Sequence, residues 1–499
     1  MAGIKALAKE TAIYGLSSIV GRFLNWCLVP LYAYLFPAEE YGIVSYLYSF
    51  TAVALVILNY GMETGFFRFA NKEEADPDKV YSTSLISVGT TSLLFIALLS
   101  IFISPVSHLL LLPEHPLYVW LLGVTVGIDA FSNIPFAYLR YRKKPVRFAT
   151  IKMVNIGCNI GLNLFFLLLC PVLSKSDAGW LINWWYDPIG GKAFGIGWIF
   201  IANILSTLVV LLLLTPYFSR NIRVFDSSLL RKMLRYSWPL LILGVAGVLS
   251  QNLGQIIIPY LFKGSEDAAR EMVGIYGANI KIAIVMVMFT QAFRYAYEPF
   301  IFAQAKNKGE NKEQAYCDAM KYFMIFGLFI FLVVMYFLPL FKHFIAPSYW
   351  SGLRVVPIMM AAELCFGVYF NLSLWYKLTD KTHWGMYFSV ICFIVMFVLS
   401  LWLIPAIGIP DGYLGAAWAA LISYFFVMCL SYFVGRKYYP IPYPMKKIGL
   451  YTVFAAILYV AGEWIYCPQS IWLTYAVRII LLLVYITAVY ILERKIKSI

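Results

Sequence analysis

Fourteen apolar segments of 18 or more residues follow one another along this 499-residue chain. About 20 apolar residues in an α-helix span the ~30 Å hydrocarbon core of a bilayer. The segments cover residues 11–36, 42–63, 81–104, 117–139, 148–172, 195–217, 237–262, 272–296, 319–341, 353–376, 384–404, 413–434, 446–464 and 471–491. Their number and length predict an all-α polytopic membrane protein with about 14 transmembrane helices.

The composition excludes most enzyme classes. The chain is 62% hydrophobic and 13% charged, with a mean hydropathy of +0.77, and the connections between segments are too short for a soluble catalytic domain. No phosphate-binding glycine loop or nucleophile elbow is present, and the four histidines lack metal-ligand spacing. We therefore expect no enzymatic activity and no bound metal, and we expect the energy for any transport to come from gradients or from a partner.

Positive charge is distributed very unevenly along the sequence. Most of the 39 lysines and arginines fall in alternate connections, beginning with the amino-terminal one. The positive-inside rule places these connections, and both termini, in the cytoplasm. Because topology accounts for most of the net charge of +14, we expect no nucleic-acid partner.

The sequence predicts two halves of six segments each, followed by two further segments at the carboxy-terminal end. A basic stretch at 219–236 has apolar residues at helical spacing and predicts an amphipathic linker helix on the cytoplasmic surface. Gly42-Ile43 in the first half recurs as Gly274-Ile275 in the second, and six segments per half predict parallel repeats. The predicted parts are an amino-terminal six-helix bundle (1–218), the linker (219–236), a carboxy-terminal six-helix bundle (237–434) and helices 13 and 14 (435–499).

The first segment carries a cation near its middle, Arg22, with Asn25 one turn further on. A guanidinium costs a few kcal/mol in the bilayer centre, so we expect it to face protein or water. Lys281 in the eighth segment is its predicted counterpart. The alternatives are a purely structural ion pair of Arg22 with Asp129 or Glu363, and snorkelling of Lys281 to the interface.

A polar row follows one face of the fifth segment. Lys152 is followed by Asn155, Asn159 and Asn163 at positions i+3, i+7 and i+11. Such a row suits a water-filled cavity or hydrogen bonds to sugars, and interhelical hydrogen bonding is the alternative. Arg478 in the last segment either lines a groove between helices or pairs locally.

Acidic side chains near the middle of segments are fewer than cations. They are Asp129 and Glu363, and either is a candidate to bind a coupling proton or sodium ion. The excess of cations predicts an interior that attracts phosphates and repels cationic drugs.

Several local sequences resemble the oligosaccharide (O-antigen, Wzx-type) flippases of the multidrug/oligosaccharidyl-lipid/polysaccharide exporter superfamily. They are Gly21-Arg22 followed by Pro37-Ala38-Glu39-Glu40-Tyr41-Gly42, Asn59-Tyr60-Gly61-Met62-Glu63 through Phe69, and Tyr295-Ala296-Tyr297-Glu298-Pro299-Phe300. The resemblance implies two six-helix bundles in a V plus two carboxy-terminal helices, a central cavity and alternating access.

The resemblance also implies a substrate and a location. Such proteins move a polyprenyl-pyrophosphate-linked oligosaccharide from the cytoplasmic to the outer leaflet of the bacterial cytoplasmic (inner) membrane, for O-antigen, capsule or exopolysaccharide assembly. A polysaccharide polymerase and a ligase are candidate partners. Arg22 and Lys281 would bind the pyrophosphate and the asparagines would contact sugars, while the polyprenyl tail stays in lipid.

Three alternatives remain open. Lipid II flippases resemble this chain in span number and in the arginine of the first span, but the second segment has no arginine before Arg68 and the eighth offers Lys281. Cation-coupled multidrug exporters usually have twelve spans and acids in the first or seventh, where this chain has none. A membrane glycosyltransferase or polymerase of the same pathway would need a large catalytic outer loop.

Overall fold

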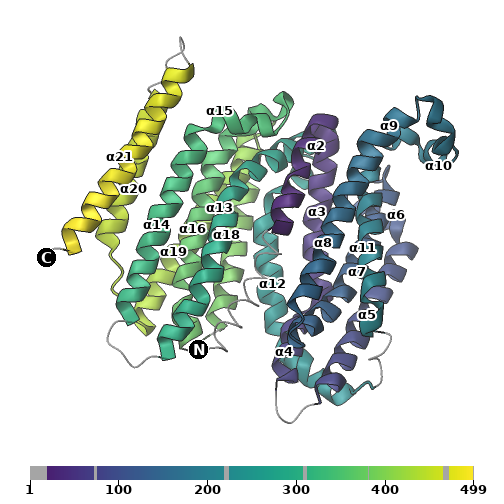
Figure 1. Cartoon of the computed structure of the whole chain (residues 1–499), viewed down its shortest axis with the longest axis horizontal. Helices are drawn as coiled ribbons and strands as arrows, with labels where there is room; N and C mark the ends of the chain where they lie inside the picture. Colours follow the sequence, from purple (N-terminus) through teal and green to yellow (C-terminus); the bar gives the residue numbers. More distant parts are fainter. Residues whose placement is uncertain are drawn as a thin grey trace. The chain divides into compact units, whose positions relative to one another are not determined.

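The computed structural model describes residues 20–71, 76–218, 224–306, 312–379, 381, 383–464 and 471–497 (Figure 1). All regular elements in these ranges are helical, and 13 helices are long and apolar enough to cross a membrane. Each of the 13 coincides with one of the segments predicted after the first. The prediction of an all-α polytopic membrane protein is confirmed.

The first predicted span, 11–36, lies partly outside the described residues. Its described part is helical over 20–26, turns at Cys27 and continues as α2 (Leu28–Leu35). The turn does not reverse the chain direction, because Cys27 itself has helical dihedral angles. Arg22 and Asn25 therefore lie on a helix, as predicted.

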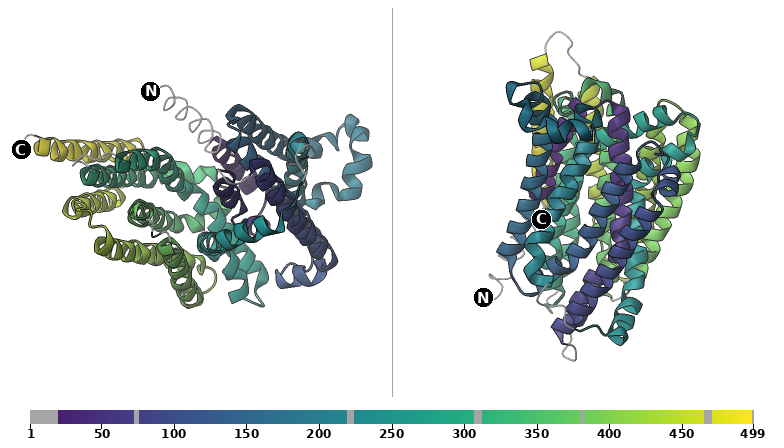
Figure 2. Two further views of the ribbon diagram at one scale, coloured as in Figure 1. Left: turned by 90° about the horizontal axis from the view of Figure 1, so that it is seen from below. Right: turned by 90° about the vertical axis from the view of Figure 1, so that its right-hand side faces the viewer.

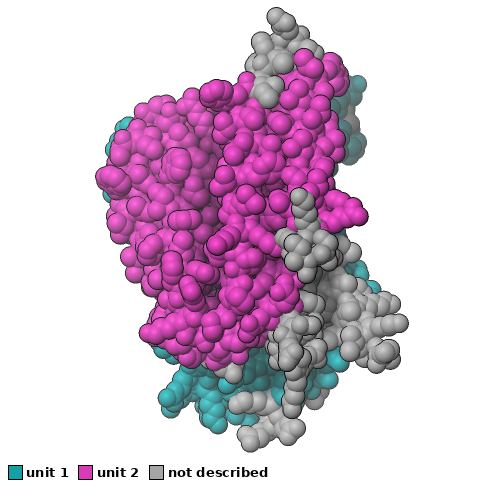
Figure 3. All heavy atoms as spheres, turned by 90° about the vertical axis from the view of Figure 1, so that its left-hand side faces the viewer, with its two compact units in different colours: residues 1–274 teal, residues 275–499 magenta. Residues whose placement is uncertain are grey.

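Contacts between residues divide the chain into two compact units, residues 1–274 and 275–499 (Figure 3). The boundary falls inside one long helix, α13 (Glu266–Lys306). Within each unit the long helices run side by side (Figures 1 and 2).

The first unit contains the following helices before α13: α2 (Leu28–Leu35), α3 (Ala38–Asn59), α4 (Met62–Ala70), α5 (Pro77–Ile101), α6 (Ile103–Leu109), α7 (Pro116–Tyr141), α8 (Pro145–Leu164), a π-helical turn (Phe165–Leu169), α9 (Cys170–Leu173), α10 (Asn183–Tyr186), α11 (Gly197–Phe218) and α12 (Ser227–Leu261). A core cluster of this unit lies where α4, α5, α7, α11 and α12 meet, around Phe66, Tyr81, Ile134, Leu214 and Met233. Phe148 and Ile151 of α8, the helix that carries the polar row, also belong to this cluster.

The second unit continues from α13 through these helices: α14 (Lys312–Tyr336), α15 (Leu338–Phe341), α16 (Val355–Leu372), α17 (Leu374–Leu378), α18 (His383–Ile407), α19 (Tyr413–Tyr438), α20 (Met445–Trp464) and α21 (Ile471–Lys497). Helices α16 and α18 pack on α19, while α20 and α21 pack on α14. The last two helices therefore belong to the second unit through α14.

Local sequence explains where several helices begin and bend. Pro77, Pro116 and Pro145 occupy the first helical position of their helices, where the missing N–H costs nothing. Tyr60 and Gly61 both adopt left-handed angles, so the span of residues 38–70 breaks between α3 and α4. Glycine at 61 adopts these angles without strain.

Helix α12 differs from the expectation of a separate linker helix at 219–236. Asp226 accepts hydrogen bonds from the N–H groups of Ser228 and Leu229, at 2.8 and 3.0 Å, and caps a helix that runs on without a break to Leu261. Residues 227–236 are thus the first turns of α12 itself. α12 packs on α3, α4 and α5 of the first unit, although the sequence placed it at the start of the second bundle.

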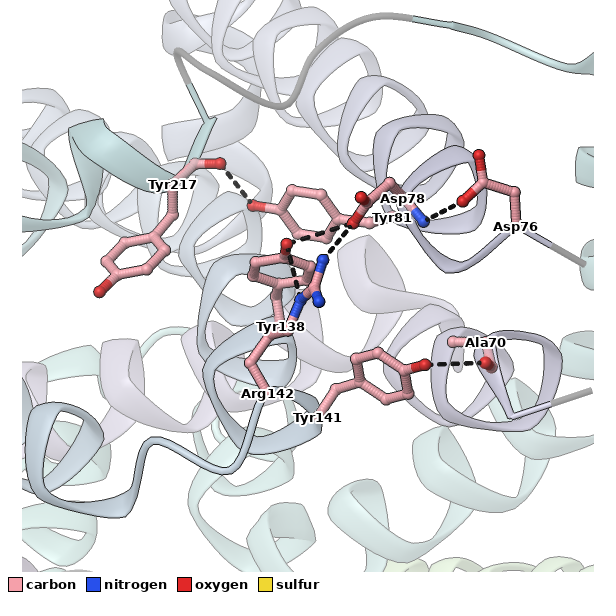
Figure 4. A network of polar contacts seen from close by, with 8 residues as sticks. All are labelled: Ala70, Asp76, Asp78, Tyr81, Tyr138, Tyr141, Arg142 and Tyr217. Atoms are coloured by element: carbon pink, nitrogen blue, oxygen red, sulfur yellow. Dashed lines mark hydrogen bonds and ion pairs between the residues drawn. The ribbon is translucent and has the colours of Figure 1, made fainter.

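A polar network ties helix ends together in the first unit (Figure 4). Arg142 donates to Asp78 at 2.8 Å and to the Tyr138 hydroxyl at 2.9 Å, and Tyr138 donates to Asp78 at 3.2 Å. Tyr81 and Tyr141 donate to the carbonyl groups of Tyr217 and Ala70. The network connects the ends of α4, α5, α7 and α11.

Candidate functional site

Arg22 and Asn25 share one exposed face of the helix at 20–26. The opposite face packs on α8, because a Cβ atom on Gly21 would lie only 2.6 Å from the Cδ1 atom of Ile156. Glycine at 21 therefore brings this helix close to α8 and leaves Arg22 directed away from that contact. The expectation that the guanidinium faces protein or water rather than lipid stays a prediction.

The polar row lies on α8 in the structure, and the exposure of its side chains decreases along the helix. Lys152, Asn155 and Asn159 are partly exposed, whereas Asn163 is fully buried. The Asn163 side chain accepts a hydrogen bond from the Tyr32 hydroxyl at 2.9 Å and donates to the carbonyl oxygen and side-chain oxygen of Asn159, at 2.8 and 3.0 Å. At this end of the row the asparagine fastens α2 to α8.

The Tyr32–Asn163 hydrogen bond is testable in a double-mutant cycle. We expect Tyr32→Phe and Asn163→Leu each to lower the thermal stability of the purified protein, with a coupling of about 0.5–2 kcal/mol between them. The coupling arises because each single variant removes the same bond and leaves one buried polar group without its partner. Strictly additive losses would contradict the bond.

Lys152 lies near charges of both signs, two carboxylates and one guanidinium. Its Nζ atom lies 4.1 Å from the centre of the Phe136 ring, and it is attracted by Asp129 of α7 and Glu63 of α4. Glu63 in turn forms an ion pair with Arg140. The first unit thus places Lys152 within electrostatic reach of Asp129, an interaction that the sequence did not indicate.

Asp129 has a second neighbour on α11. The hydroxyl of Thr207 donates to its side chain at 3.3 Å. The carboxylate is therefore placed between α7, α8 and α11, where it interacts with one cation and one hydroxyl. This placement makes Asp129 part of the charge balance of the first unit.

In the second unit, Lys281 on α13 and Glu363 on α16 are both partly exposed. Glu363 interacts electrostatically with Tyr276 of α13 and Tyr424 of α19, two buried tyrosines. Sequence reasoning missed these tyrosines, because nothing in their spacing separates them from the other aromatic residues of an apolar segment. The Glu363 carboxylate itself offers oxygen atoms of the kind that a proton or a hard cation requires.

Arg478 is held by protein groups. Its side chain is 4% exposed, and its NH1 group donates to the carbonyl oxygen of Tyr336 at 2.6 Å. Its NH2 atom lies 3.7 Å from a carboxylate oxygen of Glu463. These contacts fasten α21 to α14 and α20, as the alternative of local pairing predicted.

The candidate residues therefore fall into separate sets. Arg22, Asn25, Asp129 and the row on α8 belong to the first unit, and Lys281, Glu363 and Arg478 belong to the second. Within the described ranges, no group of three or more His, Cys, Asp or Glu side chains is arranged to hold a metal ion.

Comparisons with known proteins give a match to one family model and matches to solved structures. Residues 7–169 match the family model described as "Polysaccharide biosynthesis protein", a range that includes Arg22, Asp129 and the row on α8. A comparison with curated protein sequences gives no match.

The fold is similar to that of solved transporters. The chain matches a structure of the lipid II flippase MurJ in an inward closed conformation, with a TM-score of 0.68, 13% identity and coverage of 97% of this chain and 99% of that one. It also matches an inward-facing multidrug resistance MATE family transporter of the MOP superfamily, with a TM-score of 0.65, 14% identity and coverage of 84% and 94%. The resemblance drawn from the sequence is thus confirmed at this level: the first third of the chain carries the pattern of the polysaccharide biosynthesis proteins, and the chain has the fold of MurJ and the MATE transporters of the MOP superfamily.

Proposed function

We propose that this protein flips a polyprenyl-pyrophosphate-linked oligosaccharide from the cytoplasmic to the outer leaflet of the bacterial cytoplasmic membrane by alternating access. The product would serve O-antigen, capsule or exopolysaccharide assembly, with a polysaccharide polymerase and a ligase acting after it. Both termini would lie in the cytoplasm, as the distribution of lysine and arginine predicts. The protein would act as a transporter and not as an enzyme.

The observation that carries the proposal is the exposed face with Arg22 and Asn25 in the first apolar segment, which lies within the part that matches the polysaccharide biosynthesis family model. A guanidinium offers five donors in a planar fork that suits phosphate oxygens. Lys281 would supply a second cation from the other repeat. Asn155 and the amide nitrogen of Asn159 would contact sugars, since Asn163 is engaged with Tyr32 and with the side-chain oxygen of Asn159.

The membrane potential would help such a substrate leave. One elementary charge that crosses the full field gains about 2.3 kcal/mol per 100 mV, so a dianion gains roughly 4–5 kcal/mol in an inside-negative cell. The direction of this force matches export from the cytoplasmic leaflet. A cation-coupled exporter of cationic drugs would have to work against the same field.

The proposal can be tested by measuring lipid-linked oligosaccharide, surface glycan and drug resistance in a strain that lacks this protein. We expect lipid-linked oligosaccharide to accumulate on the cytoplasmic side and surface glycan to be lost, with drug resistance unchanged. Unchanged glycan together with increased sensitivity to cationic drugs would contradict the proposal and favour a multidrug exporter. Accumulation of lipid II instead would favour a lipid II flippase, the candidate that the fold match to MurJ supports.

We also propose that Glu363 binds the coupling proton or sodium ion, with Asp129 as the second candidate. In Glu363→Gln we expect transport to lose its response to an imposed ion gradient, because the amide cannot release a proton or neutralise a cation. Asp129→Asn tests the second candidate in the same way, and Glu313→Gln at the exposed start of α14 is the matched control. An equal response of the wild type and Glu363→Gln to the gradient would exclude Glu363 from coupling.

A further inference from the structure

The connection between α9 and α11, residues 174–196, folds back on the helices that it joins. It contains a 3₁₀ turn (Asp177–Leu181), α10 and two further 3₁₀ turns, and it is an outer connection in the predicted topology. Its middle, residues 178–186, carries no charge and includes three of the 14 tryptophans of the chain. We call residues 174–196 the tryptophan loop.

One face of the tryptophan loop packs firmly on the first unit. The ring of Trp185 stacks on Phe165, with 6.4 Å between the ring centres, and the ring of Tyr186 stacks on Trp198 of α11 at 5.1 Å. The Nε1 group of Trp198 also donates to the carbonyl oxygen of Gly191 at 2.8 Å. These contacts fix the orientation in which the loop presents its other face.

The other face is apolar and exposed. Trp180 and Trp184 are 74% and 76% exposed, and Leu181 between them is 52% exposed. The Nε1 group of Trp184 donates to the carbonyl oxygen of Leu181 at 3.0 Å, so the one donor of this ring already has a partner. We define Trp180, Leu181 and Trp184 as the tryptophan face. Contact of this face with water would be unfavourable, because all three side chains gain free energy from leaving it.

The tryptophan face follows directly on a lipid-facing stretch of helix. The span Pro145–Leu173 leads into the loop, and the apolar side chains of Leu164, Leu168 and Val172 are exposed along its last turns. Leu164 comes nine residues after Asn155, which is about two and a half helical turns, so the two lie on opposite faces of α8. Because the polar row occupies one face of this helix, the opposite face is the one suited to lipid.

The two ends of the loop have different surroundings. Figures 1 and 2 show α10 to the side of the long helices of the first unit. At the other end of the loop, Ala193 lines a polar cavity of about 760 Å³ together with Glu39 and Glu40. The loop therefore has one end beside water and one end that extends sideways with its aromatic rings exposed.

We propose that the tryptophan face is a membrane anchor that lies in the headgroup region of the outer leaflet. Tryptophan suits this depth, since its ring is apolar enough for lipid and polar enough for the interface. The partner is the lipid surface itself, on which the lipid-facing side of the fifth span continues. An anchor at this place sets the depth of the outer ends of α8 and α11 in the bilayer.

The test measures the surroundings of the tryptophan face in vesicles of phosphatidylethanolamine and phosphatidylglycerol. A nitroxide label would be attached at Trp184→Cys in the full chain, with the native cysteines replaced by alanine. Oxygen concentrates in the bilayer and a nickel chelate stays in water, so their effects on the relaxation of the label report its depth. We expect the ratio of oxygen access to nickel access to be at least about five times higher than at Ala193→Cys. Ala193 is the matched control, because it is exposed on the same loop and lines the polar cavity.

Nickel access at Trp184→Cys equal to that at Ala193→Cys would overturn the proposal. Protection from both reagents would also overturn it and would assign the face to a protein contact. Neither result depends on the transported substrate, because the vesicles contain none.

A second measurement keeps the native rings in place, since the cysteine variant removes one of them. The fluorescence that is lost on replacing Trp180→Phe and Trp184→Phe together gives the emission of these two residues. This emission should be quenched by lipids brominated near the headgroup end of their acyl chains and hardly by iodide in the water. Quenching by iodide without quenching by the brominated lipids would contradict the anchor.

Discussion

Replacing Arg22 by alanine should reduce surface glycan at least about tenfold, with lipid-linked oligosaccharide accumulating inside the cell. A hydrogen bond to a charged group is worth about 1.5–3 kcal/mol, and 1.4 kcal/mol is a factor of ten in binding. Arg22→Lys should keep an intermediate level, because lysine retains the charge but loses the planar fork that grips two phosphate oxygens. Glycan and lipid-linked intermediates would be quantified against the amount of protein in the membrane.

The control for Arg22 is its neighbour Phe23, which is 48% exposed. Phe23→Ala should leave surface glycan near the wild-type level, since it removes an apolar side chain and no charge. Lys281→Ala should act in the same direction as Arg22→Ala if both cations hold the pyrophosphate. Unchanged glycan in Arg22→Ala, with the protein present in the membrane, would remove this residue from the mechanism.

Arg478→Met should lower the stability of the protein by about 2–4 kcal/mol, seen as a fall in the Tm of the detergent-purified protein. The substitution leaves the carbonyl oxygen of Tyr336 without its charged donor in a buried place and loosens α21 from α14. Surface glycan should then fall only in proportion to the amount of folded protein.

Ile480 provides the matched control for Arg478 on the same helix. Its side chain is 57% exposed, so Ile480→Ala should change the stability by less than about 0.5 kcal/mol. An unchanged Tm in Arg478→Met, combined with lost transport, would contradict the interpretation that Arg478 stabilises the packing of α21. It would return Arg478 to the substrate ligands that the sequence suggested.

The sequence predicted the described spans well because length and apolarity are local properties. Each of the 13 spans coincides with a predicted segment. The start of α12 differs from the prediction. The amphipathic spacing at 219–236 does not show that a capped helix continues directly into the span. A helix boundary there depends on Asp226 accepting from backbone groups, which the spacing of apolar residues does not reveal.

The roles of single polar residues depended on partners far away in the chain. Asn163 is bonded to Tyr32, 131 residues earlier, and Arg478 to Tyr336, 142 residues earlier. The sequence offered both a ligand role and a packing role for each, and only the tertiary contacts favour packing.

The most direct test of the central claim uses the purified protein in vesicles that carry polyprenyl-pyrophosphate-linked oligosaccharide in one leaflet only. An impermeant glycosidase or lectin in the opposite compartment would measure the sugar that arrives there. The account predicts transfer that requires the protein and falls at least about tenfold with Arg22→Ala. Transfer no faster than in protein-free vesicles, or equal transfer by the wild type and Arg22→Ala, would contradict it.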